Sequence, residues 1–152
     1  MINKNDLGII EPYALMLAHG DDEIGAIPIV LKNPPVLVIY LTNGCGIGEI
    51  DLSEKRECET KRSWRILNSD SEVINFGSDF EIPDGALHSS LTVAHLEILE
   101  KLLADSGAKF ILTTHAEGGH QDHDTTFIVS QYLSLKLEVG LFSFQLYCQS
   151  TF

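Results

Sequence analysis

The sequence predicts an α/β protein with a Rossmann-like, doubly wound, mostly parallel five-stranded sheet. Short apolar runs alternate along the chain with segments that repeat apolar residues at helical spacing. This alternation requires parallel strands joined by right-handed crossovers, and we expect the strand order 3-2-1-4-5 in one domain over residues 1–152. The expected elements are strand 13–18, helix 23–31, strand 36–41, helix 51–67, strand 72–76, helix 91–104, strand 109–114, helix 125–137 and strand 141–148.

The first three elements follow from apolar runs and from one proline. Residues 13–18 form a continuous apolar run, which predicts a strand buried on both faces. Residues 23–31 predict a short helix, which Pro28 weakens. Residues 36–41 are β-branched, aromatic and preceded by proline, so they give the strongest strand signal in the chain.

The middle of the chain begins with a helix-start signal. Asp51-Leu-Ser-Glu54 resembles a capping box and opens a helix that reaches about Leu67. Residues 72–76 predict the third strand. Residues 77–90 read as a loop, because they contain the turn sequence Pro83-Asp84-Gly85.

The last part of the chain alternates again between helix and strand. Residues 91–104 are amphipathic, and Gly107 follows as a candidate C-cap. Residues 109–114 predict the fourth strand, 125–137 a helix and 141–148 the fifth strand.

Composition excludes several classes of protein. The 152 residues carry a net charge of −12 and have a mean hydropathy of +0.08, so the chain is globular and repels nucleic acid over most of its surface. No apolar run approaches the ~20 residues of a membrane span. Three scattered cysteines without a CxxC pair favour a reducing, cytoplasmic location. Half of the basic residues cluster where any anion-binding patch is expected: Lys55, Arg56, Lys61, Arg62 and Arg65.

The first strand ends in a polar motif, Ala18-His-Gly-Asp-Asp-Glu23. It places one imidazole and three carboxylates within five residues. One interpretation is structural, with Asp21 or Asp22 as the N-cap of the next helix. The other is chemical, because His and Asp side chains are ligands of metals such as zinc.

The fourth strand ends in a second polar motif, residues 115–124, with three histidines and three acids in ten residues. The spacing of His120 and His123 is common among metal ligands. The alternative is a solvated loop before a helix, with Asp122 or Asp124 as its cap.

The predicted topology brings the two motifs together. Strands 1 and 4 are neighbours at the topological switch point, where doubly wound proteins bind ligands beyond the carboxyl ends of the strands. Two histidines and one carboxylate would leave zinc an open position, and such a site can hydrolyse. A bound metal lowers the pKa of a water ligand, and the second carboxylate of the Asp21–Asp22 pair can accept its proton.

The two motifs resemble those of the LmbE-like (PIG-L) family of zinc-dependent de-N-acetylases, which act on N-acetylglucosamine-containing substrates. The family signature Ala-His-Pro-Asp-Asp-Glu stands here at residues 18–23, with Gly20 in place of proline, and His-x-Asp-His stands at 120–123. An Arg-x-x-Glu helix and an Asp-Gly loop of the family correspond to residues 56–59 and 83–85. The resemblance extends from Tyr13 to about Ser134.

The resemblance also implies roles for individual residues. It places the zinc ligands at His19, Asp22 and His123, the general base at Asp21, the histidine that stabilises the oxyanion or protonates the amine at His120, and substrate contacts at Arg56 and Asp84. Another divalent transition metal is an alternative to Zn²⁺. Arg56 can instead belong to a solvated helix face paired with Glu59, and Asp84 can be a turn residue.

The function expected from these residues is a zinc-dependent hydrolase that removes an acetyl group from an N-acetylated amino sugar or a related small linear amide. The first alternative is a catalytically impaired metal- or sugar-binding domain of the same fold. The second alternative is a metal phosphoesterase. The sequence argues against it, because it offers one set of three ligands and not the ligands for two metals. Family members usually continue beyond the end of this chain. Three alternatives follow: the pocket is wide open, a partner subunit of a homo-oligomer completes it, or the chain is a shortened relative.

Overall fold

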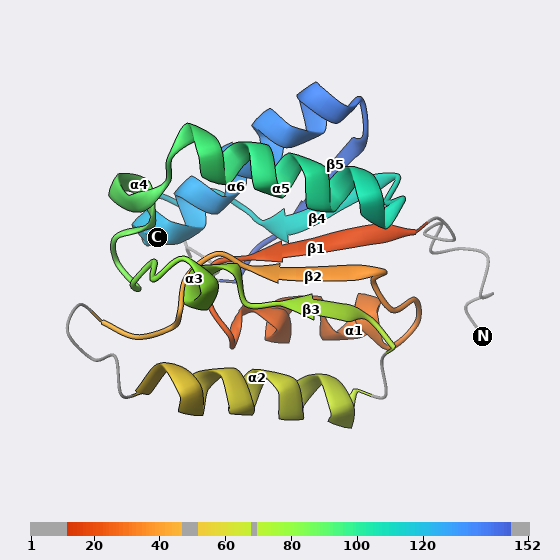
Figure 1. The fold of residues 1–152 in the computed structure, drawn as a ribbon. Helices are drawn as coiled ribbons and strands as arrows, with labels where there is room; N and C mark the ends of the chain where they lie inside the picture. Colours follow the sequence, from red (N-terminus) through yellow and green to blue (C-terminus); the bar gives the residue numbers. More distant parts are fainter. Residues whose placement is uncertain (1–11, 47–51, 68–69, 147–152) are drawn as a thin grey trace, which may run out of the picture.

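The computed structural model describes residues 12–46, 52–67 and 70–146. Within them, the strands form a five-stranded parallel sheet of order β3-β2-β1-β4-β5, which confirms the predicted fold class (Figure 1). Every residue of β1 is buried, because the strand lies at the centre of the sheet with helices on both faces. The strands are β1 (Tyr13–Leu17), β2 (Leu37–Tyr40), β3 (Glu72–Ile74), β4 (Phe110–Thr114) and β5 (Gly140–Phe144).

Two helices cover each face of the sheet, and short helices lie at the carboxyl ends of the strands (Figure 1). On one face lie α1 (Ile27–Val30) and α2 (Ser53–Ile66), and on the other α5 (Val93–Ser106) and α6 (Gln121–Leu137). The short elements at the carboxyl end are the 3₁₀ helix η2 (Asp22–Ala26), α3 (Phe76–Asp79) and α4 (Leu87–Ser90).

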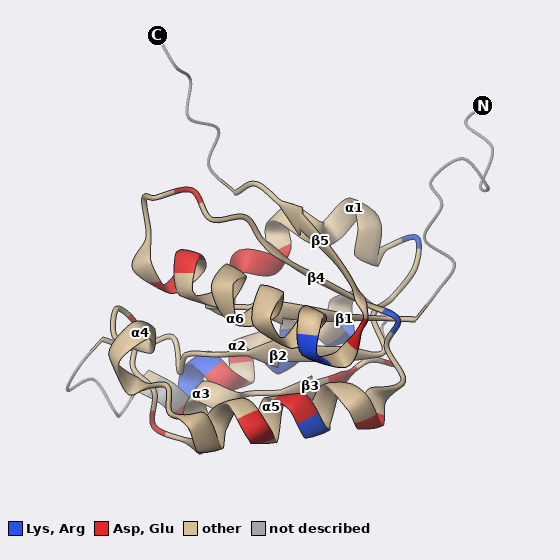
Figure 2. Cartoon of the chain, turned by 90° about the horizontal axis from the view of Figure 1, so that it is seen from above, with Lys and Arg blue, Asp and Glu red and all other residues tan. Residues whose placement is uncertain are grey.

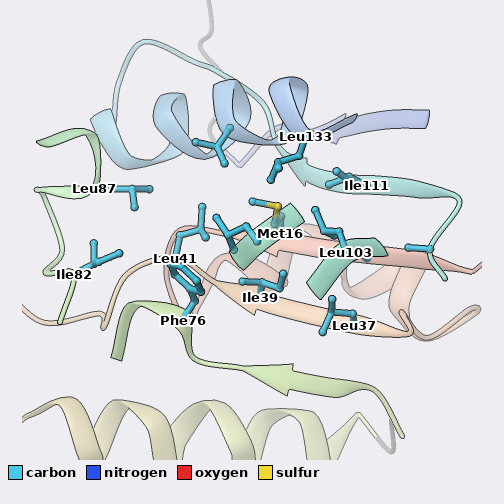
Figure 3. Packing of buried hydrophobic residues seen from close by; sticks show 14 residues of the cluster. Met16, Leu37, Ile39, Leu41, Phe76, Ile82, Leu87, Leu103, Ile111 and Leu133 are labelled. Carbon is cyan, nitrogen blue, oxygen red and sulfur yellow. The ribbon is translucent and has the colours of Figure 1, made fainter. Parts of the chain in front are cut away.

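Each face of the sheet has its own hydrophobic core, because residues of the strands alternate between the two faces. Toward α5 and α6, Met16 and Ile111 of the sheet lie among helix residues such as Leu103 and Leu133 (Figure 3). The opposite core contains Tyr40 of β2 and Trp64 of α2.

Several expected boundaries were wrong. The helix expected over 23–31 is split into η2 and α1, because Pro28 lacks an N–H and belongs in the first turn of a new helix. The expected loop 77–90 contains α4 and most of α3. The helix expected from Thr125 begins at Gln121, with His120 as its N-cap, so neither Asp122 nor Asp124 caps it.

Other boundaries shift by a few residues or cannot be compared. The strand expected over 141–148 is β5, which begins at Gly140 and ends at Phe144, and residues 147–148 lie outside the described residues. Asp51 of the expected capping box also lies outside them.

The C-cap expected for the long helix before β4 is confirmed. Gly107 has φ 70°, the left-handed conformation that glycine adopts without a steric cost. The same helix, α5, begins with a capping box that the sequence analysis did not predict. The Thr92 hydroxyl accepts from the His95 N–H, and His95 Nδ1 accepts from the Thr92 N–H. Among the described residues, no helix combines the length and the apolar character needed to cross a membrane.

Candidate active site

The two polar motifs meet at the carboxyl ends of β1 and β4, as the predicted strand order requires. β1 pairs directly with β4, so the segments that follow these strands leave the same edge of the sheet. His19 follows β1, and His123 lies in the first turn of α6, after β4. Their ring centroids are 5.2 Å apart although 104 residues separate them in the sequence.

Three buried side chains present donor atoms to one another at the centre of the site. His123 Nε2 lies 3.3 Å from His19 Nδ1 and 3.1 Å from Asp22 Oδ1. Asp22 Oδ2 lies 3.5 Å from His19 Nδ1. The same Oδ2 accepts the backbone N–H groups of Ala18 and His19, at 3.1 and 2.8 Å, and these bonds fix the carboxylate at the end of β1.

These distances suit a metal ion. Four ligands at the usual 2.0–2.1 Å around zinc stand about 3.3 Å from one another in a tetrahedron. His123 Nε2 stands close to that length from both His19 Nδ1, at 3.3 Å, and Asp22 Oδ1, at 3.1 Å, while His19 Nδ1 lies 3.5 Å from the other oxygen of Asp22, Oδ2. Two imidazoles and one carboxylate are also a donor set of a hydrolytic zinc site. The residues present therefore fit a divalent transition metal.

Neighbouring side chains form other groupings of possible ligands within 4.8 Å around the same histidine. His19 groups with His120 and His123, with Asp84 and Asp122, and with Asp21 and Asp22. Each grouping contains His19, which makes this imidazole the common member of every candidate ligand set among the described residues.

Asp122 contacts the site directly, and the sequence analysis assigned it no role there. It is completely buried, and its Oδ2 lies 3.2 Å from His19 Nε2. Its carboxylate also accepts the backbone N–H groups of Gly85 and Leu87, at 2.6 and 3.1 Å. Its position between the two histidines of His-x-Asp-His could have indicated a contact with the site, but the sequence also allows this residue to be a helix cap. In the structure it orients His19 and holds the 84–87 segment against the site.

Electrostatics at the site follow from these contacts. Burial alone would lower the pKa of His19, but its contacts with Asp122 and Asp22 outweigh burial and raise the pKa to about 10. Burial alone would raise the pKa of both carboxyls. The contacts of Asp22 with His123 and His19 instead hold its pKa well below the usual range, and His19 and backbone N–H groups lower the pKa of Asp122 to about 2.

The two residues with an expected role in proton transfer, Asp21 and His120, both line the cavity at the donor cluster. Asp21 is exposed and lines the cavity, next to the buried Asp22. The His120 ring centroid lies 4.8 Å from that of His19 and 4.7 Å from that of His123. His120 Nδ1 accepts the backbone N–H of Asp122, which leaves Nε2 of the neutral ring to carry the proton.

A cavity of about 380 Å³ opens over the donor cluster. It is lined by the first motif, by residues after β2, by one side of α2 and by Asp84 and His120. Arg56 lines it too, and its guanidinium donates to Glu59 Oε2 at 3.4 Å. Asp84 Oδ1 lies 3.1 Å from His19 Nε2. All seven predicted site residues therefore lie at this cavity or in its donor cluster.

The family proline is replaced by Gly20 where α2 comes close to the motif. A Cβ atom at Gly20 would stand 2.7 Å from Thr60 Oγ1. Thr60 is buried and its hydroxyl donates to the Arg56 carbonyl, so a side chain at Gly20 would require that hydroxyl to move. Glycine at this position lets α2 approach the site closely.

Glu23 is a second buried acid that the sequence analysis did not single out. Its carboxylate accepts from the Tyr40 hydroxyl at 3.3 Å, and that hydroxyl accepts from Trp64 Nε1 at 2.8 Å. Burial raises the pKa of Glu23 to about 7. This chain of hydrogen bonds joins the first motif to β2 and α2.

The fold and the site together define a doubly wound α/β protein with a His- and Asp-rich centre at its switch point. The sequence profile of the PIG-L family, described as GlcNAc-PI de-N-acetylase, matches residues 14–133. The chain belongs to the PIG-L family, as its two motifs predict. Among curated proteins, no match reaches significance.

Solved structures with the same fold include several deacetylases. The A40926 pseudoaglycone deacetylase Dbv21 has a TM-score of 0.67 and 16% identity over 89% of this chain and 63% of its own. The deacetylase triple mutant Orf2*T of the teicoplanin biosynthetic pathway has a TM-score of 0.68 and 14% identity, over 88% and 63%. N,N'-diacetylchitobiose deacetylase from Pyrococcus horikoshii gives 0.65 and 16%, over 82% and 49%. At these identities the likeness establishes the fold, and the chain spans less than two thirds of each of these proteins.

Proposed function

We propose that the chain is a metal-dependent amidohydrolase that removes the acetyl group from an N-acetylated amino sugar or a related small linear amide. The observation that carries the proposal is the convergence of His19, Asp22 and His123 at separations of 3.1 to 3.5 Å beneath an open cavity. Membership of a family described as a de-N-acetylase supports the same reaction.

Three of the seven residues hold the metal in this proposal. His19 Nδ1, an oxygen of Asp22 and His123 Nε2 are its ligands. The Nε2–H of His19 donates to Asp122, which fixes the tautomer that leaves Nδ1 free for the metal. With Zn²⁺ or a similar divalent ion held by these residues, the pKa of a water ligand would fall toward neutrality and the acetyl carbonyl would be polarised.

The remaining residues move protons and bind the substrate. Asp21 accepts the proton of the attacking water. It lies beside the proposed ligands His19 and Asp22, and its own carboxylate is not assigned to the metal. As an imidazolium, a form in which Nδ1 carries a proton and no longer accepts the Asp122 N–H, His120 stabilises the oxyanion and then gives its Nε2 proton to the departing amine, which leaves the neutral ring. Arg56 and Asp84, which both line the cavity, contact the sugar.

The names of the structural relatives support the substrate class. One of them is described as an N,N'-diacetylchitobiose deacetylase and another as a pseudoaglycone deacetylase. A structure of teicoplanin deacetylase Orf2 is described as a zinc-inhibited form, so zinc need not be the most active metal in this fold. A homo-oligomer that completes the cavity and a single domain over 1–152 stay predictions.

Amine release from a panel of N-acetylated amino sugars tests the proposal. The chain is stripped with a chelator, reloaded separately with Zn²⁺, Co²⁺ or Fe²⁺, and assayed for free amine and acetate in equal amounts. We expect cleavage of at least one sugar that stops on chelation and returns with metal. Metal binding without release of amine from any sugar would contradict the proposal and favour the impaired metal- or sugar-binding domain.

A further inference from the structure

Helix α2 forms one wall of the cavity, and most of its surface is charged. The helix lines the cavity with four residues: Arg56, Glu57, Glu59 and Thr60. Basic and acidic residues lie side by side on α2 (Figure 2). Of the five basic residues where the sequence analysis expected any anion-binding patch, three form ion pairs within the helix: Lys55, Arg56 and Lys61. These ion pairs join one part of α2 to another and do not attach the helix to the sheet.

Two residues one turn apart, Thr60 and Trp64, connect α2 to the rest of the molecule. Both are buried, whereas most other described side chains of the helix, including Ile66, are exposed. A helix usually takes its place from an apolar face that packs on the core. Among its described residues, α2 buries one large apolar side chain, Trp64. The position of the helix therefore depends on what holds this indole.

A chain of hydrogen bonds holds the indole of Trp64. Its Nε1–H donates to the Tyr40 hydroxyl at 2.8 Å, and that hydroxyl donates to Glu23 Oε2 at 3.3 Å. The three side chains are buried, and they come from α2, from the end of β2 and from η2. A buried donor that lost its acceptor would be destabilising, so the chain favours one orientation of the indole.

The two ends of this chain differ in how firmly they are held. Beside Glu23, the Asp22 carboxylate accepts two backbone N–H groups at the end of β1, at 3.1 and 2.8 Å. Tyr40 belongs to β2, whose backbone pairs with β1 along its length. α2 is a helix and takes no part in this ladder. Loss of the chain should therefore displace α2 and leave the proposed metal ligands in place.

We propose that Trp64, Tyr40 and Glu23 are positioning residues: they set where α2 places Arg56 and its neighbours in the cavity, and so how tightly the sugar binds. The inference rests on the proposed function, because it concerns the substrate contacts of that site. α2 carries no proposed metal ligand or proton-transfer residue, so the chain acts on substrate binding. Misplacing one substrate contact should cost about what one hydrogen bond contributes, which is a roughly 3- to 10-fold higher KM.

Trp64→Phe is the first test, because phenylalanine keeps an aromatic ring without an N–H to donate, and Trp64 does not itself line the cavity. With the metal-loaded chain and N-acetylglucosamine, we expect KM to rise by that factor while kcat and the metal content stay close to those of the parent. A fall in kcat or in metal content at an unchanged KM would overturn the inference.

A double-mutant cycle separates the hydrogen bonds from packing. Tyr40→Phe removes the hydroxyl that links the two ends of the chain. The double variant with Trp64→Phe should raise KM hardly more than either single change, because both break the same chain. Tyr132→Phe makes the same substitution at an exposed position of α6 and should match the parent. Effects on KM that multiply in the double variant would show independent packing losses and would overturn the role of the chain.

The acceptor end of the chain has its own pair of variants. Glu23→Leu removes the acceptor and should raise KM as Tyr40→Phe does. Glu23→Gln can still accept from the Tyr40 hydroxyl and should recover most of that loss. Equal KM values for the two variants would remove Glu23 from the positioning residues.

Trp64 also reports the position of α2 whether or not any sugar is cleaved, because it is the only tryptophan of the chain. In Tyr40→Phe, shown to be folded by circular dichroism, we expect faster solvent exchange of the indole N–H and stronger quenching of fluorescence by acrylamide. Calorimetric titration of the metal-loaded proteins with glucosamine should show weaker binding to this variant.

Each of these measurements can contradict the inference by itself. Unchanged exchange and quenching would show that the Tyr40 hydroxyl does not hold α2. Equal binding of glucosamine to parent and variant, or no binding to the parent, would show that α2 does not place the sugar contacts. If both expected results are obtained but the parent releases no amine from any sugar, the proposed reaction fails and the positioning of α2 stands.

Discussion

His19 uses its two ring nitrogens in two directions, and this organises the site. Nδ1 faces Asp22 and His123, while Nε2 faces Asp122 and Asp84 at 3.2 and 3.1 Å. A metal-ligating imidazole needs one bare nitrogen and usually donates from the other to a carboxylate. The buried Asp122 provides that acceptor, so the ring is held in one orientation before any ligand binds.

Asp21→Asn tests the general base. Asparagine keeps the shape of the side chain but cannot accept the proton, so turnover should fall roughly 10²- to 10⁴-fold while the metal is retained. Steady-state amine release and elemental analysis measure the two quantities on the same sample. Asp105→Asn, a surface change on α5, is the control and should match the parent. Full activity of Asp21→Asn on a sugar that the parent cleaves would refute the assignment.

His120→Ala and His123→Ala distinguish ligand from proton donor. His120 and His123 are both close enough to His19 to complete a ligand set with it. We assign His123 as the ligand because its Nε2 also lies 3.1 Å from Asp22 Oδ1. His120→Ala should therefore keep one metal per chain and lose turnover, whereas His123→Ala should lose the metal. The reverse pattern of metal contents would exchange the two roles.

Glu23→Gln should change how stability depends on pH. The pKa of this buried carboxyl is raised to about 7 from its usual 4.5, so its ionisation destabilises the fold increasingly between these values and by a constant amount above pH 7. Glutamine can still accept from Tyr40 without a charge.

Urea unfolding of chelator-treated protein gives the measurement. We expect the variant to match the parent near pH 4 and to exceed its free energy of unfolding by up to about 3 kcal/mol above pH 7. A difference between the two proteins that is the same at both pH values would contradict this account.

At the scale of elements, the sequence predicts best where burial sets the pattern. β1, β2 and β4 lie between two helical layers, so their residues are apolar throughout and the runs are easily seen. α3 and α4 have four residues each and no periodicity to detect, and tertiary contacts hold them in place. The same limit applied to Asp122, whose role depends on His19, 103 residues away in the chain.

Gly77→Ala tests the packing of α3 on the end of β2. A Cβ atom at Gly77 would stand 2.1 Å from the backbone carbon of Thr42, which no side-chain rotation can relieve. We expect a loss of about 1–3 kcal/mol in the free energy of unfolding, the usual cost of overpacking. Gly119→Ala is the control, since a Cβ there meets nothing within 4 Å. Equal stability of the Gly77 variant and the parent would contradict this packing.

At the scale of the whole molecule, strand order explains why the site could be predicted at all. Placing β1 beside β4 brings together segments a hundred residues apart, and this order was predicted as a common arrangement of doubly wound sheets, a class that alternation and crossover handedness indicate. The ligand geometry required atomic positions, and the partners of Nε2 of His19 became visible only in the structure.

Stability should depend on pH in opposite directions with and without metal: the metal-free fold should lose stability as pH rises, and the stabilisation by bound metal should grow. In the metal-free fold the pKa of His19 is raised to about 10 from 6.5, so the stabilisation by its charged form is complete below pH 6.5 and is lost toward pH 10. The slope is at most about 1.4 kcal/mol per pH unit, the limit for one proton.

The same proton competes with the metal, because a ligand imidazole must be neutral. The rise in Tm on adding a fixed excess of Zn²⁺ should therefore be larger at pH 8 than at pH 6, while the Tm of the chelator-treated chain falls over that interval. Thermal unfolding with and without metal at both values measures both trends. His19→Gln should lose the zinc-induced rise, since it removes a ligand, and in the chelator-treated variant the fall in Tm should shrink to the part that Glu23 contributes below pH 7. A zinc-induced rise in Tm of equal size at both values would show that proton release from His19 does not accompany binding.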